Sequence, residues 1–171
     1  MDAKKRRDRL MDKLKKAGVP VTGSALAQEL GVSRQVVVGD IAILRAAGAE
    51  IYATPQGYLL PVERLQAVAT AKIACYHDGD KLADELMIMV DNGGKVIDVI
   101  VEHPVYGELK ANLMLASRRD IAEFLHKLQN GGGKPLSVVT GGVHLHTVEA
   151  PSQEAINRIE EELEEQGILF K

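Results

Sequence analysis

Between residues 24 and 45 the chain reads Ser24-Ala-Leu-Ala-Gln-Glu-Leu-Gly-Val-Ser-Arg-Gln-Val-Val-Val-Gly-Asp-Ile-Ala-Ile-Leu-Arg45. Leu26 and Leu30 are spaced as on one face of a helix. Gly31 can adopt the left-handed conformation that ends a helix, and the hydroxyl of Ser33 can cap the next one. The stretch therefore predicts two short helices joined at Gly31, which is the layout of a helix-turn-helix.

The second of these helices has a narrow apolar stripe, formed by Val37, Ile41 and Leu44. Away from this stripe, small side chains lie next to Arg34 and Gln35, which suits a helix that lies in the major groove of DNA. A helical hairpin that packs but binds nothing has similar spacing, so the flanking segments have to support this interpretation. The DNA contacts that we predict are Ser33, Arg34, Gln35, Val38, Gly39 and Ala42.

Both flanks agree with a winged helix-turn-helix over residues 1–61. Residues 4–16 carry eight Lys or Arg side chains, with Leu10 and Leu14 on an apolar side. Such a basic amphipathic helix can be a solvated face, a membrane-surface helix or a helix that contacts phosphates. Acidic residues within it weaken the membrane option. Residues 50–60 read as two short strands around Pro55-Gln56-Gly57, which is typical of a wing.

Charge and composition divide the chain near the same point. Residues 1–60 hold ten Lys or Arg and six Asp or Glu, whereas residues 61–171 hold eleven and eighteen. We therefore expect a DNA-binding domain over 1–61 and an acidic second domain over 62–171. The chain has no apolar run long enough to span a membrane and begins with a charged segment, so we expect it to be cytoplasmic.

The sequence pattern of the second domain predicts an α+β sandwich of the split βαβ type. A short linking helix over 62–72 is expected to run into a strand over 72–77. The further elements are expected in the order helix, strand, strand, helix, strand, helix. The helices are expected over 81–91 with Asp80 as N-cap, to residue 130 with Ser117 as N-cap, and to residue 166 with Ser152 as N-cap. The strands are expected over 95–102, 107–115 and 142–149.

Histidines supply the chemistry of this domain. His144 and His146 lie two apart in a strand, so both imidazoles leave the same face. His77 ends the first strand, and Glu85 lies one turn into the next helix. If the first and last strands are neighbours, these four side chains can converge on Zn, Ni, Fe or Mn. Two strand histidines can equally be solvated or hydrogen-bonded without a metal, and Cys75 is predicted as inert core.

The chain resembles the niacin-responsive transcriptional repressors, in which a winged helix-turn-helix precedes a domain named 3H for three histidines. The segments that carry the resemblance are Val32–Arg45, Asp98-Val-Ile-Val-Glu-His-Pro-Val-Tyr-Gly-Glu-Leu109 and Gly141-Gly-Val-His-Leu-His-Thr147. The resemblance implies a regulatory metal ion held by His77, Glu85, His144 and His146. It also implies nicotinic acid as co-repressor, acting on genes for NAD biosynthesis or niacin uptake.

We expect nicotinate to bind at or beside the metal ion, because a carboxylate or pyridine nitrogen can take an open coordination position. Arg118 and Arg119 are candidate carboxylate partners, and His103 is a candidate contact in a loop of the second segment. We expect a homodimer held mainly by the second domain, and a palindromic operator, because symmetric dimers usually bind palindromic DNA.

Two other interpretations stay open. In a metal-sensing repressor, the metal ion itself would be the signal. In a metal-dependent hydrolase, an open coordination position would activate water. The sequence has no Ser-His-Asp constellation or phosphate-binding glycine motif near the four ligands, so we expect that the chain is not an enzyme.

Overall fold

The computed structural model describes residues 2–61 and 69–171. The chain divides into two compact units, Met1–Arg64 and Leu65–Lys171, and each is described by itself. The boundary that we predict after residue 61 adjoins residues 62–68, which lie outside the described ranges. Within those ranges, no helix has both the length and the apolar character needed to cross a lipid bilayer.

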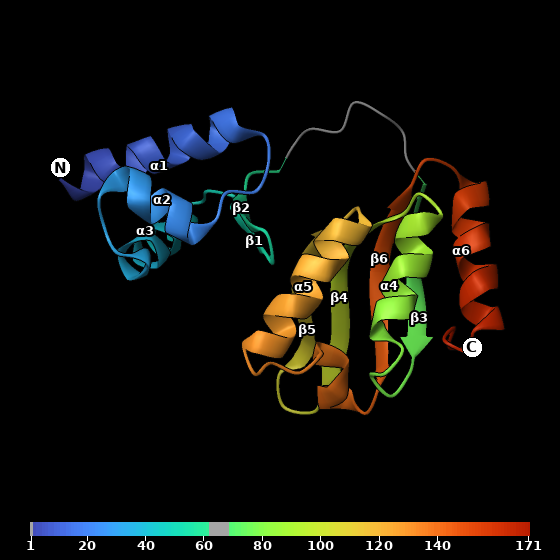
Figure 1. Cartoon of the computed structure of the whole chain (residues 1–171). Helices are drawn as coiled ribbons and strands as arrows, with labels where there is room; N and C mark the ends of the chain where they lie inside the picture. Colours follow the sequence, from blue (N-terminus) through green and yellow to red (C-terminus); the bar gives the residue numbers. More distant parts are fainter. Residues whose placement is uncertain (1, 62–68) are drawn as a thin grey trace. The chain divides into compact units, whose positions relative to one another are not determined.

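The first unit is the expected winged helix-turn-helix (Figure 1). Gly31 ends α2 at φ +66°, and the hydroxyl of Ser33 accepts the backbone N–H of Val36 to begin α3. Leu10, Leu26, Val37, Ile41 and Ile51 are among the buried residues of its core. Its elements are α1 (Ala3–Ala17), α2 (Gly23–Leu30), α3 (Arg34–Ala46), β1 (Tyr52–Thr54) and β2 (Gly57–Leu59).

The wing is the antiparallel hairpin of β1 and β2, with Thr54 paired to Gly57. Its second strand also bridges to the segment before α2, through the pair of Val21 and Tyr58. Gly57 has φ +136°, and a Cβ there would lie 2.4 Å from the carbonyl oxygen of Val21. Only glycine therefore allows this close approach of the wing to the helices.

The second unit contains a four-stranded sheet in the order β3-β6-β4-β5, in which all neighbours are antiparallel. Since β6 is antiparallel to both β3 and β4, these two strands are parallel to each other, and α4 connects them. A strand inserted between two parallel strands is the split βαβ arrangement that the sequence predicts. The elements are β3 (Ala69–Tyr76), α4 (Leu82–Asp91), β4 (Lys95–His103), β5 (Gly107–Leu115), α5 (Arg118–Asn130), η1 (Leu136–Thr140), β6 (Val143–Ala150) and α6 (Gln153–Glu165).

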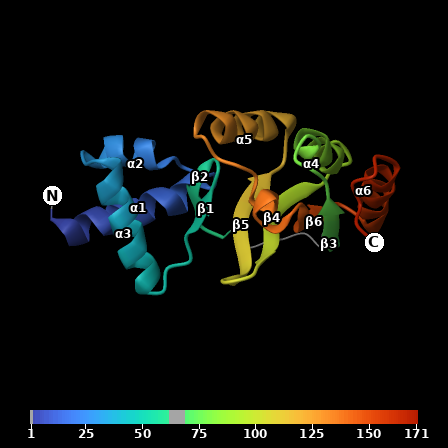
Figure 2. The same cartoon turned by 90° about the horizontal axis from the view of Figure 1, so that it is seen from below.

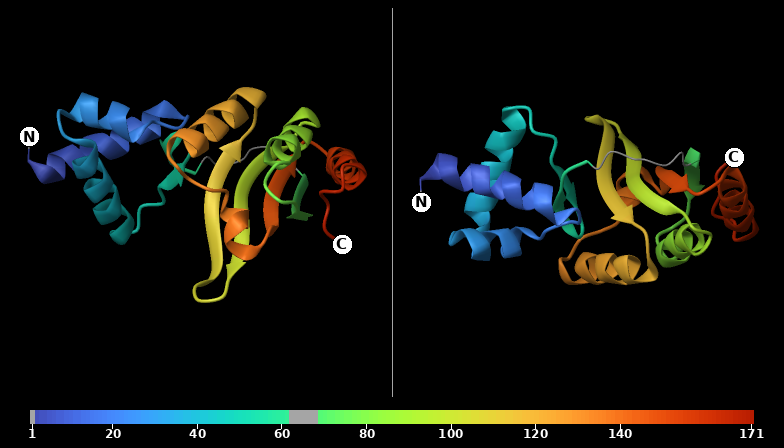
Figure 3. Two further views of the ribbon diagram at one scale, coloured as in Figure 1. Left: turned by 60° about the horizontal axis from the view of Figure 1, so that its bottom comes forward. Right: turned by 90° about the horizontal axis from the view of Figure 1, so that it is seen from above.

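Helices α4 and α5 lie on one face of this sheet, and α6 flanks α4 beside β3 (Figures 2 and 3). The core lies between the sheet and these helices. Leu86, Met89, Leu115, Ile121 and Ile159 are fully buried in it. The core continues to the carboxyl end of β3 and the first turn of α4, where polar side chains replace apolar ones.

Two local expectations were wrong. Residues 69–71, expected near the end of a linking helix, belong to β3 because they pair with β6, while residues 62–68 of that helix lie outside the described ranges. Asp80 does not cap α4, since Lys81 holds the N-cap position without a side-chain hydrogen bond. The short helix η1 is an element that the sequence pattern did not predict.

Candidate metal centre

Glu85 is the centre of a cluster of three histidines at one end of the sheet. His77 directly follows β3, Glu85 lies in the first turn of α4, and His144 and His146 lie on β6. Strands β3 and β6 are neighbours, as the convergence requires. All four side chains are buried, Glu85 completely.

The carboxylate of Glu85 contacts all three imidazoles. Its Oε2 lies 2.8 Å from Nε2 of His77 and 3.5 Å from Nε2 of His146. Its Oε1 lies 2.8 Å from Nε2 of His144. Residues that are up to 69 positions apart thus share one buried carboxylate, and the structure brings together the whole predicted ligand set.

The other ring nitrogens of His144 and His146 face backbone carbonyls. Nδ1 of His144 donates to the carbonyl of Gly142 at 2.8 Å, and Nδ1 of His146 donates to the carbonyl of Asp98 at 2.7 Å. A carbonyl only accepts, so each Nδ1 carries a proton. In the neutral ring this leaves the lone pair on Nε2, which points toward Glu85 and is free to bind a metal ion.

Charge in the metal-free cluster follows from these contacts. Burial opposes ionisation of Glu85, but the attraction of His146 and the hydrogen bonds from His144 and His77 outweigh it and lower the pKa of Glu85 well below 4.5. Burial also opposes charge on His144, yet its bond to Glu85 and the attraction of that carboxylate raise its pKa above 6.5. Glu85 is therefore an anion and His144 its imidazolium partner.

His77 is oriented differently. Its Nδ1 accepts the backbone N–H of Gly79 at 3.1 Å, so in the neutral ring Nε2 carries the proton and donates to Glu85. Coordination through Nε2 requires that this proton move to Nδ1 and that the bond from Gly79 be given up. In the metal-free protein, His77 thus orients the carboxylate.

Asp98 supports the cluster from the neighbouring strand. Pairing of β4 is irregular around this residue, and its Oδ1 accepts the backbone N–H of Thr147 at 3.0 Å. Its Oδ2 lies 3.1 Å from Nζ of Lys110. These bonds fix the backbone carbonyl that receives Nδ1 of His146, and so they fix that ring.

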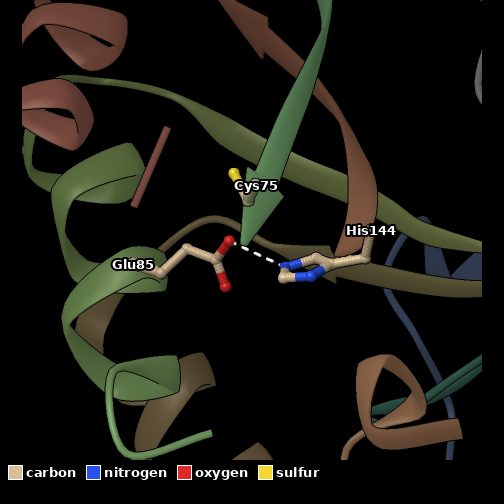
Figure 4. Close-up of side chains that lie close together, drawn as sticks. All are labelled: Cys75, Glu85 and His144. Atoms are coloured by element: carbon tan, nitrogen blue, oxygen red, sulfur yellow. Dashed lines mark hydrogen bonds and ion pairs between the residues drawn. The ribbon is translucent and has the colours of Figure 1, made fainter. Parts of the chain in front are cut away.

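Cys75 lies beside the cluster, which the sequence interpretation missed. It is paired with His144 across β3 and β6, and ligand atoms of Cys75, Glu85 and His144 lie within 4.8 Å of one another (Figure 4). Burial, with the neighbouring Glu85, raises the pKa of the Cys75 thiol, so it is a neutral thiol in the metal-free state. The spacing of Cys75 and His77, two apart at the end of a strand, was the signal that could have revealed it.

The donor set fits a divalent transition metal. Imidazole, carboxylate and a nearby sulfur are ligands that Zn, Ni and Fe accept. Among the described residues, Nε2 of His146 is a buried polar atom without a hydrogen-bond partner. Such an atom is costly to bury unless something binds it. The buried group of Cys75, Glu85 and His144 could therefore bind a metal ion, together with the two other imidazoles.

A small cavity of about 30 Å³ adjoins His144 and His146. Its walls come from the sheet, α4, α5 and the segment of η1, and they are almost entirely apolar. The lining residues are Leu82, Leu86, Val99, Leu113, Phe124, Pro135, Leu136, Ser137, His144 and His146.

The three candidate effector contacts do not line this cavity. Arg118 is exposed and pairs with Asp91, and Arg119 is exposed and pairs with Glu123. His103 stabilises the turn after β4, where its Nδ1 accepts the N–H groups of Val105 and Tyr106. The structure therefore does not bring these three residues to the histidine cluster.

In the first unit, the candidate DNA contacts lie together on one side of α3 and its N-cap. Ser33, Arg34, Gln35, Gly39 and Ala42 are exposed, and Val38 is half-buried. The side chain of Arg34 lies close to Gly23, the first residue of α2. A Cβ added to Gly23 would lie 3.5 Å from Nε of Arg34.

Models of two protein families match the chain. The 3H domain matches residues 70–171, and an HTH domain matches residues 6–59. The first match contains all four residues of the cluster, and the second contains the recognition helix and both wing strands.

Curated relatives match almost the whole chain. The "Probable transcription repressor NiaR" of Thermotoga maritima is 44% identical over 163 residues, which cover 92% of this chain and 89% of that protein. The "Transcription repressor NadR" of Bacillus subtilis is 42% identical over 168 residues, 97% of this chain and 93% of that protein. These names agree with the expectation that the chain is not an enzyme.

Proposed function

The chain belongs to the family of 3H-domain transcription repressors that includes these NiaR and NadR relatives, and from this premise we propose that it represses genes of NAD biosynthesis or niacin uptake with nicotinic acid as co-repressor. Operator DNA binds to the first unit, and a metal ion and nicotinate bind to the second. The observation that carries the proposal is the contact of one buried carboxylate with three imidazoles beside an apolar cavity.

Operator recognition is assigned to the exposed side of α3. Gln35 can pair with adenine and Arg34 with guanine, each through two hydrogen bonds. Gly39 and Ala42 allow the helix to approach the base edges closely, because neither has a long side chain. The formal charge of +4 on residues 1–60 supports attraction to the phosphates.

The metal ion is assigned to His77, Glu85, His144 and His146. When bound, a transition metal would supply open coordination positions for a carboxylate or a pyridine nitrogen. Glu85 balances part of its charge, and the carbonyls of Gly142 and Asp98 hold the rings of His144 and His146 in place. Ni, Zn, Fe and Mn all suit this set of donors.

Nicotinate is assigned to the cavity beside His144 and His146. Apolar walls suit the faces of its ring, and the imidazole end suits its polar groups. A space of about 30 Å³ holds only about one water molecule, so Phe124 and Leu136 have to move. Leu136 begins η1, and Gly131–Gly133 and Gly141–Gly142 on either side provide places for the backbone to bend.

A homodimer is assigned to the end of the sheet that carries the cluster. All seven large hydrophobic side chains that are exposed in residues 69–171 belong to this end. Their placement at this end follows from the topology, because β3 and β4 end beside the start of β6. Phe170 also lies at this end, since its ring contacts that of Tyr76. A second copy of the chain would cover these side chains. They are Tyr76, Val105, Tyr106, Val138, Val139, Val143 and Phe170.

Operator titration tests the effector. The metal-loaded protein is titrated onto a DNA duplex that it has selected from random sequence, with and without nicotinate. We expect nicotinate to tighten binding by about tenfold or more and the response to vanish in His146→Ala. The matched control is His126→Ala, because His126 is exposed on α5. A wild-type affinity indifferent to nicotinate refutes the co-repressor role, and an affinity that follows metal concentration alone establishes a metal sensor.

Sedimentation tests the dimer. Val105→Asp places a charge among the seven side chains and is expected to give a monomer. Val19→Asp makes the same change at an exposed valine of the first unit and should leave the dimer intact. A Val105→Asp protein that sediments like the wild type would remove this surface from the assembly.

A further inference from the structure

A buried ion pair joins the recognition helix to the basic first helix. Asp40 of α3 is 2% exposed. Its Oδ2 accepts Nε of Arg6 at 2.5 Å, and its Oδ1 accepts Nη2 of Arg6 at 3.1 Å. Nη1 of Arg7 lies 3.6 Å from Oδ1. Two adjacent guanidinium groups of α1 thus face a single carboxylate of α3.

This pair restrains orientation more than an apolar contact does. Apolar packing tolerates small rotations of a helix, whereas a two-bond contact between guanidinium and carboxylate has fixed directions. A buried carboxylate that loses its partner is also costly, so the pair strongly favours one arrangement. Asp40 directly follows Gly39, which lies on the exposed side of the same helix.

The carboxyl end of α3 is also held by the two hydrogen bonds of an arginine side chain. Both Nε and Nη2 of Arg45 donate to the carbonyl of Ile51, at 2.9 Å and 2.7 Å. Ile51 immediately precedes β1 of the wing. The recognition helix is therefore restrained by α1 near its middle and by the wing at its carboxyl end.

We propose that Asp40 is a positioning residue for operator recognition: through Arg6 and Arg7 it sets the rotation of α3, and so the aim of the base-reading side chains. This inference rests on the proposed DNA binding and adds a residue that touches no DNA. It also sets Arg6 apart from the other basic residues of α1, because its guanidinium serves α3.

The test compares Asp40→Asn with Glu29→Gln. Glu29 forms an ion pair with Lys13 between α2 and α1, and both side chains of that pair are more than 40% exposed. Each variant removes one carboxylate from the first unit. The wild-type protein first selects its preferred duplex from random sequence, and affinities are then measured for this duplex and for a scrambled one of equal length, at the same salt concentration.

Asp40→Asn is expected to weaken binding to the selected duplex tenfold or more, with binding to the scrambled duplex unchanged within twofold. Glu29→Gln should leave both within twofold. A loss of affinity on both duplexes that follows the fraction of unfolded protein would reduce Asp40 to a stabilising residue. Unchanged affinity in Asp40→Asn would overturn the proposal outright.

Arg6→Lys keeps the charge of α1 and removes the planar fork, so it tests the proposal even if Asp40→Asn folds poorly. We expect it to lose selectivity as well, and the double variant to lose less than the product of the two single losses. Independent effects would overturn the pairing. A wild-type protein that selects no sequence would instead refute operator recognition itself.

Discussion

At the scale of single residues, the charge of the Glu85 cluster determines what it can bind. In the metal-free protein, His144 carries a second proton because its pKa is raised beside Glu85. A metal ion bound there would compete with that proton for Nε2 of His144, so binding would release it. The same carboxylate would therefore serve two states: as the partner of an imidazolium and, if a metal ion binds, as one of its ligands.

Replacing Glu85 with glutamine should abolish metal binding. The amide has the shape of the carboxylate but no negative charge, so we expect the affinity for Zn or Ni to fall by more than about 100-fold. Asp84→Asn is the matched control, because Asp84 precedes Glu85 in the same turn and is exposed. Metal content after equilibrium dialysis measures both, and a Glu85→Gln protein that keeps its metal would exclude Glu85 as a ligand.

Stabilisation by metal should grow with pH. The folded pKa of His144 is raised, so its stabilising charge is fully present below the unfolded value of about 6.5 and is lost as pH rises through the folded pKa. Above that point the metal-free protein loses stability, while a metal ion binds without displacing a proton.

Melting temperatures with and without metal should therefore diverge as pH rises above about 6.5, the ordinary pKa of a histidine. In acid, the low pKa of Glu85 delays loss of its charge, and the stabilisation it provides disappears only as pH falls through that value. A metal-dependent shift that shrinks with rising pH would contradict this account.

Residue types identified the cluster only in part. The spacing of His144 and His146 requires a shared face, and this was predictable from strand geometry. The position of Cys75 opposite His144 depends on the register of β3 and β6, which a single sequence does not contain. The carboxylate partners of Arg118 and Arg119 were not predictable from the sequence either, because each arginine had several possible partners.

At the scale of elements, the turn between η1 and β6 connects the cavity to the cluster. Gly141 and Gly142 both have positive φ, +77° and +107°. A Cβ on Gly142 would lie 2.7 Å from the carbonyl oxygen of His77, whereas a Cβ on Gly141 would have no neighbour within 4 Å. A substitution at Gly141 therefore tests backbone strain alone, whereas one at Gly142 adds a steric clash.

Gly141→Ala should cost about 1–2 kcal/mol of unfolding free energy through strain alone. Gly142→Ala should cost about 1–3 kcal/mol more. It should also weaken metal binding about 10- to 100-fold, because the carbonyl of Gly142 orients His144. Denaturant unfolding and metal titration measure the two effects. Equal metal affinity in both variants would show that this turn does not support the site.

Element positions were predicted best where local signals are strong. Ser33, Ser117 and Ser152 each cap the helix that the sequence assigns to them. The helix expected over residues 62–72 was wrong for 69–71, because the pairing of β3 with β6 overrides the local preference of an alanine-rich stretch.

At the scale of the whole molecule, charge separates the two units. Residues 1–60 carry a formal +4 and residues 61–171 a formal −7. Only the first unit should release counterions from DNA on binding, and each neutralised phosphate adds about 0.9 to the slope of affinity against salt.

Replacing both Lys4 and Lys5 with glutamine should therefore lower the slope for operator binding, by about 0.9 for each phosphate that is no longer neutralised. Lys134→Gln removes a positive charge from an exposed position of the second unit and should leave the slope unchanged. Fluorescence anisotropy over a series of salt concentrations measures this. A slope that changes with Lys134 would mean that the second unit also contacts DNA.

The four cluster residues come from three stretches of chain, and His144 is 59 positions from Glu85. An ion bound there would tie these distant stretches together only in the folded protein, so its binding free energy would add to the stability of the fold. Metal-starved cells would then degrade the protein faster and hold fewer copies of it. Transcription of the target genes would rise under chelation even with nicotinate in excess. The supply of iron, nickel or zinc would then change repression through the amount of this protein alone.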